Sequence, residues 1–154
     1  MDRILNSLFI IYCIANASKN CVCRPHAFSR AGDVLQDIEN AGFKISALET
    51  FLLDFGKADE FLEVYRGVVD NYGEMVRELS SGPCLALRIA ADTDDVVARF
   101  RQLCGPADPA VAKAIRPGTL RAKYGDSATR NGVHCTDLPE DGPLEVEYFF
   151  KVLQ

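Results

Sequence analysis

Apolar positions follow two different periods along residues 20–154. Short apolar runs with alternating faces predict four β-strands, at residues 21–23, 43–53, 84–90 and 132–135. Apolar residues spaced three or four positions apart predict helices over residues 29–40, 57–79, 92–103, 110–115 and 144–153. The second of these helical stretches is predicted to break near residues 69–71. The polar, glycine-containing residues 116–130 are predicted to form a loop.

The resulting order, β-α-β-α-β-α-β-α, predicts an α/β (α+β) fold. It fits a ferredoxin-like βαββαβ sandwich with a four-stranded antiparallel sheet and added helices. A chain of 154 residues is long enough for one domain with a buried core, and we expect that domain at residues 20–154.

Residues 1–19 are expected to form an apolar N-terminal extension. Its run Leu8–Ala15 is too short to span a bilayer as a helix. The run is typical of a packed segment or of a signal-peptide core. The start of the chain sets Asp2 against Arg3 and has no net positive charge, which favours the packed segment.

Charge and cysteine content narrow the class of protein. The net charge of −5 and the pI of 5.0 disfavour a general nucleic-acid binder, although a small cationic pocket stays compatible with them. The six cysteines form no C-x-x-C pair and are accompanied by two histidines, which disfavours a zinc site. We interpret them as reduced thiols of a cytoplasmic protein.

The segment Arg130–Asp137 carries the candidate chemistry. Its His134 can act as a neutral nucleophile near pH 7, and Thr136 and Glu145 are polar groups that could hold its ring. Taken alone, His134 could equally be a core or turn histidine whose ring nitrogen bonds a backbone carbonyl. Arginines that could bind an anion cluster late in the chain, at Arg101, Arg116, Arg121 and Arg130.

Five ordered motifs carry a family resemblance. They are Pro25-His26-Ala27, Ser81-Gly82-Pro83, Cys104-Gly105-Pro106-Ala107-Asp108-Pro109, Arg116-Pro117-Gly118-Thr119-Leu120-Arg121 and Arg130-Asn131-Gly132-Val133-His134. Together they resemble the successive signatures of the nucleoside diphosphate kinases, from about Asn20 to Gln154. The stretch His134–Gly142 resembles more narrowly the second kinase domain of an axonemal, tandem-domain branch of that family.

The resemblance implies transfer of the γ-phosphate of a nucleoside triphosphate to a nucleoside diphosphate, in two ping-pong halves through a phosphohistidine. By position, His134 matches the nucleophile, and Glu145 and Thr136 match the groups that support it. Mg²⁺ would be bound through the nucleotide phosphates. Homo-oligomers are also common in the family. The nucleotide-binding positions implied by the resemblance are Arg24, Tyr72, Arg101, Arg121 and Asn131.

Several positions depart from the family pattern. Arg24 replaces a lysine, Leu62 a tyrosine and Ala107 a threonine, while Asn71 lies where a base-stacking phenylalanine is usual and Tyr72 is the nearest aromatic. These losses favour an alternative, in which a degenerate kinase-fold module has a structural role on tubulin or axonemal partners in the cilium. His26 is predicted to lie exposed in a loop.

Overall fold

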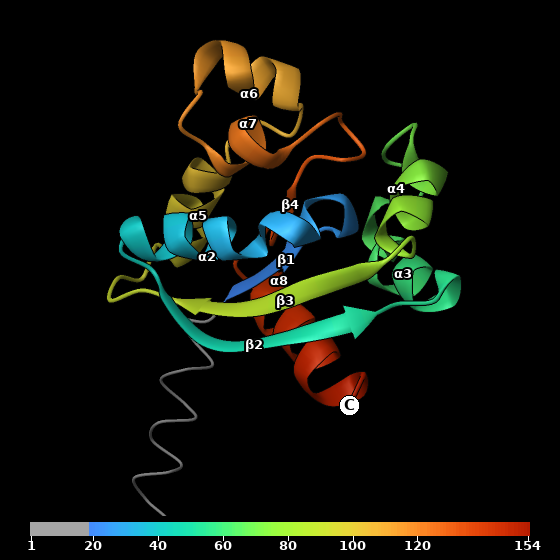
Figure 1. Cartoon of the computed structure of the whole chain (residues 1–154). Helices are drawn as coiled ribbons and strands as arrows, with labels where there is room; N and C mark the ends of the chain where they lie inside the picture. Colours follow the sequence, from blue (N-terminus) through green and yellow to red (C-terminus); the bar gives the residue numbers. More distant parts are fainter. Residues whose placement is uncertain (1–18) are drawn as a thin grey trace, which may run out of the picture.

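The computed structural model describes residues 19–154, so the predicted extension lies outside the described residues except for Lys19 (Figure 1). Its strands form one sheet in the order β2-β3-β1-β4, and each neighbouring pair is antiparallel. This arrangement confirms the predicted ferredoxin-like fold. The strands are β1 (Lys19–Cys23), β2 (Lys44–Leu52), β3 (Pro83–Ala90) and β4 (Val133–Cys135).

Helices connect the strands and cover both faces of the sheet. Two short 3₁₀ turns and a C-terminal π-helical turn complete the chain: η1 (Pro25–Arg30), η2 (Glu63–Tyr65) and η3 (Tyr148–Val152). The α-helices are α2 (Ala31–Asn40), α3 (Phe55–Phe61), α4 (Tyr72–Leu79), α5 (Val96–Cys104), α6 (Pro109–Ile115), α7 (Leu120–Tyr124) and α8 (Asp141–Glu147).

Strand alternation divides the core into two layers, because successive side chains of a strand point to opposite faces. On one face, Cys21 and Cys23 pack with buried residues of α2, α5 and α7. On the other face, Val22 packs with buried residues of α3 and α4 and with Phe149. Both faces of β1 are therefore covered by apolar side chains. A polar side chain on the neighbouring β4 is stable in such surroundings when it is hydrogen-bonded to other protein groups.

The structure differs from the predicted elements in several places, and two of these differences concern segments that carry predicted site residues. Residues 116–130 are not a simple loop, because Leu120–Tyr124 forms α7 and buries Leu120, Ala122 and Tyr124. The last helix begins at Asp141 and not at Leu144. Pro143 therefore lies in the first turn of α8, where proline is tolerated because its missing N–H would have no intrahelical partner.

Residues 19–154 contain no helix that is both long and apolar enough to cross a membrane. The five cysteines in this range are free thiols.

Candidate active site

β4 directs His134 to the α3 side of the sheet. Val133 and Cys135 point into the layer beneath α5 and α7, so alternation turns the residue between them to the opposite face. In the register of the sheet, His134 lies beside Val22 of β1. Only 6% of His134 is exposed, which places its imidazole in a site largely closed to water.

A carboxylate holds one nitrogen of this ring. Nε2 of His134 lies 3.2 Å from Oε2 and 3.3 Å from Oε1 of Glu145, which belongs to α8. Thr136 donates a hydrogen bond of 2.9 Å from Oγ1 to the same Oε2. An ionised carboxylate only accepts hydrogen bonds, so a neutral His134 must carry its proton on Nε2. The lone pair of the ring is then on Nδ1, as an in-line nucleophile requires.

Two aromatic rings flank the imidazole. The ring of Phe61 meets His134 edge to face with centroids 5.1 Å apart, and the ring of Tyr65 lies at 6.4 Å. The hydroxyl of Tyr65 donates to Asp137, and Arg101 of α5 forms an ion pair with the same carboxylate. Burial alone would raise the pKa of Asp137, but these two partners outweigh it and hold that pKa below its usual range. Asp137 is therefore a charged group of the site.

Arg121 supports β4 from the other face. Its guanidinium donates from Nε to the carbonyl of Val133 at 3.2 Å and from Nη1 to the carbonyl of Gly105 at 3.0 Å. Nη2 reaches Sγ of Cys135 at 3.6 Å. The Cys104 thiol donates a hydrogen bond to Cys135. This bond and the nearby positive charge of Arg121 lower the pKa of the Cys135 thiol and outweigh burial, which would raise it. Arg121 thus bonds both neighbours of His134 in the strand.

Arg24 and His26 are buried, so the prediction of an exposed His26 was wrong. The side chain of Arg24 is 3% exposed and that of His26 is 4% exposed, and each contacts Glu78 of α4. Pro25 begins η1, a compact turn that folds His26 back against α4 and away from solvent. Glu78 was not predicted as a site residue, although the motif Ser81-Gly82-Pro83 begins three positions after it.

The remaining predicted residues lie in different surroundings. Asn131 is 7% exposed and precedes Gly132 and β4, and its buried Oδ1 has no hydrogen-bond partner among residues 19–154. The hydroxyl of Tyr72 bonds Asp59 and its ring is covered by the guanidinium of Arg66. Neither of these contacts of Tyr72 belongs to the group around His134.

Two of the departures from the family pattern, Leu62 and Ala107, lie in different parts of the structure. Leu62 is fully buried in the layer containing Val22 and Phe149, so its side chain is a core group that points away from solvent. A hydroxyl does approach the site one turn later, at Tyr65. Ala107 is exposed just before α6, where Asp108 provides the N-cap.

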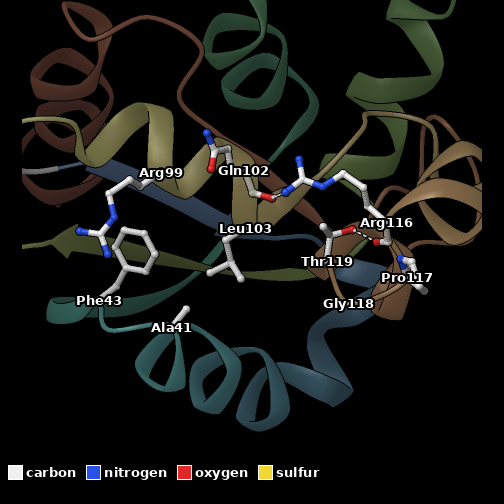
Figure 2. Close-up of a pocket in the computed structure, with 9 residues that line it drawn as sticks. All are labelled: Ala41, Phe43, Arg99, Gln102, Leu103, Arg116, Pro117, Gly118 and Thr119. Carbon is white, nitrogen blue, oxygen red and sulfur yellow. Dashed lines mark hydrogen bonds between the residues drawn. The ribbon is translucent and has the colours of Figure 1, made fainter.

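One cavity adjoins the site, and another lies apart from it. The first, of about 400 Å³, lies beside the rings of Phe61 and Tyr65 that flank His134 and is lined by Phe61, Tyr65, Asp137, Leu138, Leu144 and Glu145, among others. The other, of about 450 Å³, lies between α5 and residues 116–119 (Figure 2). In that pocket Arg116 donates from Nη2 to the carbonyl of Gln102 at 2.9 Å. The first cavity is open beside Glu145 and Asp137, whereas no lining residue of the second belongs to the His134 group.

The described part of the chain has no group of three or more histidine, cysteine, aspartate or glutamate side chains that could hold a metal ion. A Mg²⁺ that enters with a nucleotide would be coordinated mainly by phosphate oxygens and water, which is this ion's usual mode of binding. Asp137, which is paired with Arg101, is an ionised carboxylate of the site that could face such an ion.

The fold and this arrangement together define the class. The chain belongs to the nucleoside diphosphate kinase family, whose family model, described as nucleoside diphosphate kinase, matches residues 19–154. Among characterised relatives, the chain is 50% identical over 146 residues to nucleoside diphosphate kinase homolog 7 of Rattus norvegicus. That match covers 90% of this chain but 36% of the rat protein, so the chain spans about a third of that relative's length.

Shorter relatives are matched over nearly their whole length. The nucleoside diphosphate kinase of Desulfovibrio desulfuricans is 38% identical over 137 residues, covering 86% of this chain and 93% of that protein. The crystal structure of the Aquifex aeolicus nucleoside diphosphate kinase superposes with a TM-score of 0.81 at 30% identity. That superposition covers 89% of this chain and 96% of the other.

Proposed function

We propose that this domain is a nucleoside diphosphate kinase that works through a phosphohistidine on His134. The observation that carries the proposal is the contact between Nε2 of His134 and the carboxylate of Glu145. It fixes the tautomer in which Nδ1 is nucleophilic, and it favours the positive charge that develops on the ring during attack.

The proposed reaction has two half-reactions: His134 is phosphorylated in the first and dephosphorylated in the second. In the first, the Nδ1 lone pair attacks the γ-phosphorus of a nucleoside triphosphate. A P–N bond forms, the bond from the γ-phosphorus to the bridging oxygen breaks, and the nucleoside diphosphate leaves with that oxygen and its electron pair. In the second, a β-phosphate oxygen of another nucleoside diphosphate attacks the phosphorus of the phosphohistidine. A P–O bond forms and the P–N bond breaks, and its electron pair returns to Nδ1, which restores the neutral ring.

Charge stabilisation comes from fixed cations, as in other phosphoryl transfers. Arg101 is the arginine best placed to reach a phosphate, because its side chain is 45% exposed at the site. The guanidinium of Arg121 supports β4 from behind and adds positive charge near the ring. A nucleotide-bound Mg²⁺ would neutralise charge on the phosphate oxygens.

The test is incubation of the purified protein with γ-labelled ATP and Mg²⁺. We expect covalent label that is labile in acid and stable in alkali, and its transfer to added GDP. His134→Ala should remove the label while leaving ADP affinity and the fold largely intact. Label that persists in His134→Ala, or that maps to His26, would overturn the assignment.

One observation favours a second function. The guanidinium groups of Arg24 and Arg121 are bonded to protein groups, which reduces what they offer to a nucleotide. A degenerate module that docks on tubulin or axonemal partners in the cilium would need no phosphoryl transfer. A protein that binds tubulin, but forms no phosphohistidine with ATP and Mg²⁺, would support this function over a cytoplasmic kinase. Self-association as a homo-oligomer can be measured in the same preparation by sedimentation.

A further inference from the structure

A buried ion-pair bridge joins the turn after β1 to the segment that leads into β4. Arg24 donates from Nη1 to Oε2 of Glu78 at 2.9 Å, and His26 Nδ1 lies 2.6 Å from Oε1 of the same carboxylate. The Glu78 side chain is only 8% exposed. Burying an isolated charge is costly, and here the opposite charges of Arg24 and Glu78 offset each other. Among residues 19–154, Nε of Arg24 has no hydrogen-bond partner, so the bonds of this side chain run through Nη1.

The bridge bonds the backbone of residues 129–132 at three points. Arg24 donates from Nη1 to the carbonyl of Thr129 at 3.2 Å, and its backbone N–H donates to the carbonyl of Gly132 at 3.0 Å. The N–H of Gly132 donates to Nε2 of His26 at 3.1 Å. Because Nε2 accepts that bond, a neutral His26 carries its proton on Nδ1 and donates it to Glu78. Both backbone polar groups of Gly132 are therefore bonded to the Arg24–His26 turn.

Gly132 transmits this restraint to the nucleophile. Its φ of +86° is a left-handed conformation, and an added Cβ would lie 3.0 Å from the backbone of Tyr124. A side chain is therefore excluded, and the segment is held through its backbone alone. His134 follows two residues later, and the intervening Val133 is fully buried. A shift of Gly132 would move the ring against Glu145.

Arg24 is poorly available to a nucleotide. Its side chain is 3% exposed, and Nη1 is shared between Glu78 and Thr129. Burial would raise the pKa of Glu78, but the hydrogen bond from His26 and the charge of Arg24 outweigh it and lower that pKa. Glu78 is therefore ionised at neutral pH and neutralises Arg24, which leaves little net charge to attract a phosphate.

We propose that Glu78 is a positioning residue for phosphoryl transfer: through Arg24 and His26 it fixes residues 129–132 and hence the nucleophile strand, and Arg24 serves this bridge instead of binding phosphate. The inference rests on the proposed kinase function for its kinetic consequence. The structural part of the proposal is that the bridge holds the backbone of Gly132 in place, and this can be tested without measuring catalysis.

The main variant is Glu78→Gln, which keeps the shape but removes the charge and one acceptor. The matched control is Glu74→Gln, on the same helix, where the side chain is exposed. Single-turnover phosphoenzyme formation and ADP affinity are measured separately. Because a small displacement of a reacting group can cost about 100-fold in rate, we expect Glu78→Gln to lower the rate at least about tenfold. ADP affinity should stay within about twofold, and the control should behave as the wild type.

Arg24→Lys keeps the charge and provides a second variant should Glu78→Gln fold poorly. Both bonds leave from the single nitrogen Nη1, and the ammonium of a lysine ends one bond short of that atom. A lysine should therefore not hold Glu78 and Thr129 together, and its phosphoenzyme rate should also fall with unchanged ADP affinity. If Arg24 binds phosphate, Glu78→Gln would release it and tighten ADP binding, or Arg24→Lys would raise the rate. Either result overturns the proposal.

Amide hydrogen exchange separates this inference from the kinase function. In the absence of nucleotide, the amide of Gly132 should exchange faster in Glu78→Gln and in Arg24→Lys than in the wild type or in Glu74→Gln. A wild type that forms no phosphohistidine, while Gly132 still loses protection in both variants, refutes the kinase function and keeps the bridge. Equal Gly132 protection in all four proteins refutes the bridge, whatever the activity.

Discussion

Nε2 of His134 lies 3.2 Å from Oε2 of Glu145, so the carboxylate and the proposed point of attack are on opposite nitrogens of one ring. A side chain hydrogen-bonded to Nδ1 would compete with the incoming phosphate. A side chain hydrogen-bonded to Nε2 orients the ring and leaves Nδ1 accessible. The contact joins β4 to α8, two elements that the chain forms in succession.

The first prediction concerns this contact. Glu145→Gln keeps a hydrogen-bonding group but removes the charge that stabilises the developing imidazolium, and we expect single-turnover phosphoenzyme formation to fall about 100-fold. ADP affinity should change little, because the carboxylate contacts the ring. Glu147→Gln is the control, since Glu147 lies in the same helix and is paired with Lys151 at the surface. A rate unchanged in Glu145→Gln would remove the carboxylate from the mechanism.

The second prediction concerns the family tyrosine that is absent at Leu62. Because Leu62 is fully buried, Leu62→Tyr should overpack the core and lower the free energy of unfolding by about 1 to 3 kcal/mol without restoring a hydroxyl to the site. Urea unfolding measures this change. A stable Leu62→Tyr with a faster phosphoenzyme rate would show that the position can open towards the site.

The third prediction concerns the hydroxyl of Tyr65, which bonds Asp137 beside Arg101. Tyr65→Phe removes that bond and keeps the ring that flanks His134. We expect weaker ADP binding through a less ordered Arg101, by about fivefold, which corresponds to the loss of one hydrogen bond of about 1 kcal/mol. Isothermal titration measures it, with Tyr124→Phe as control, because the hydroxyl of Tyr124 also bonds an aspartate, Asp37, and lies outside the cavity that Tyr65 lines.

Much of this fold could be predicted because two periods of apolar residues are clear in the chain. Val22, flanked by Cys21 and Cys23, has a short alternating pattern, and the structure places these side chains in opposite layers. Helix α7 was missed because it has five residues, too few for a helical repeat to show. Its stability comes from burying Leu120 and Tyr124 against other elements, which no local pattern reveals.

The site was predictable where its residues lie close in sequence and unpredictable where they do not. His134, Thr136 and Glu145 fall within twelve positions, and the structure brings all three together. Glu78 and His26 are separated by 52 positions and meet only because α4 packs beside the turn after β1. Asp137 directly follows Thr136, so its place in the sequence could have marked it as a candidate site residue.

The fourth prediction concerns pH. The pKa of Glu78 is lowered in the folded state, so the bridge contributes stability above the ordinary glutamate pKa of about 4.3 and loses it as the pH falls through the lower folded pKa. The difference in unfolding free energy between the wild type and Glu78→Gln should therefore be largest near pH 7 and shrink below about pH 4.3. Urea unfolding across this range measures it. A difference independent of pH would mean that Glu78 is not stabilised as the anion.

The fifth prediction concerns residues 116–130, which as a polar loop would be expected to fold over the site and become ordered only with nucleotide. Arg121 instead donates to Val133, Gly105 and Cys135 without a ligand, so α7 should already resist amide exchange in the free protein. Arg121→Ala should lower the free energy of unfolding by about 2 to 3 kcal/mol, because it removes hydrogen bonds from a charged donor to the buried Val133 and Cys135 and to Gly105.

Arg130→Ala is the control for this prediction, since Arg130 is exposed and its pair with Asp126 should contribute less than about 1 kcal/mol. Urea unfolding of both variants, with amide exchange measured before and after addition of Mg-ADP, separates the two roles of Arg121. A structural role requires loss of stability in Arg121→Ala and protection of residues 120–124 without nucleotide. Full stability in Arg121→Ala, with protection of residues 120–124 appearing only on addition of Mg-ADP, would instead make Arg121 a mobile phosphate ligand. In that case its three bonds to β4 and Gly105 would have to break whenever a nucleotide binds.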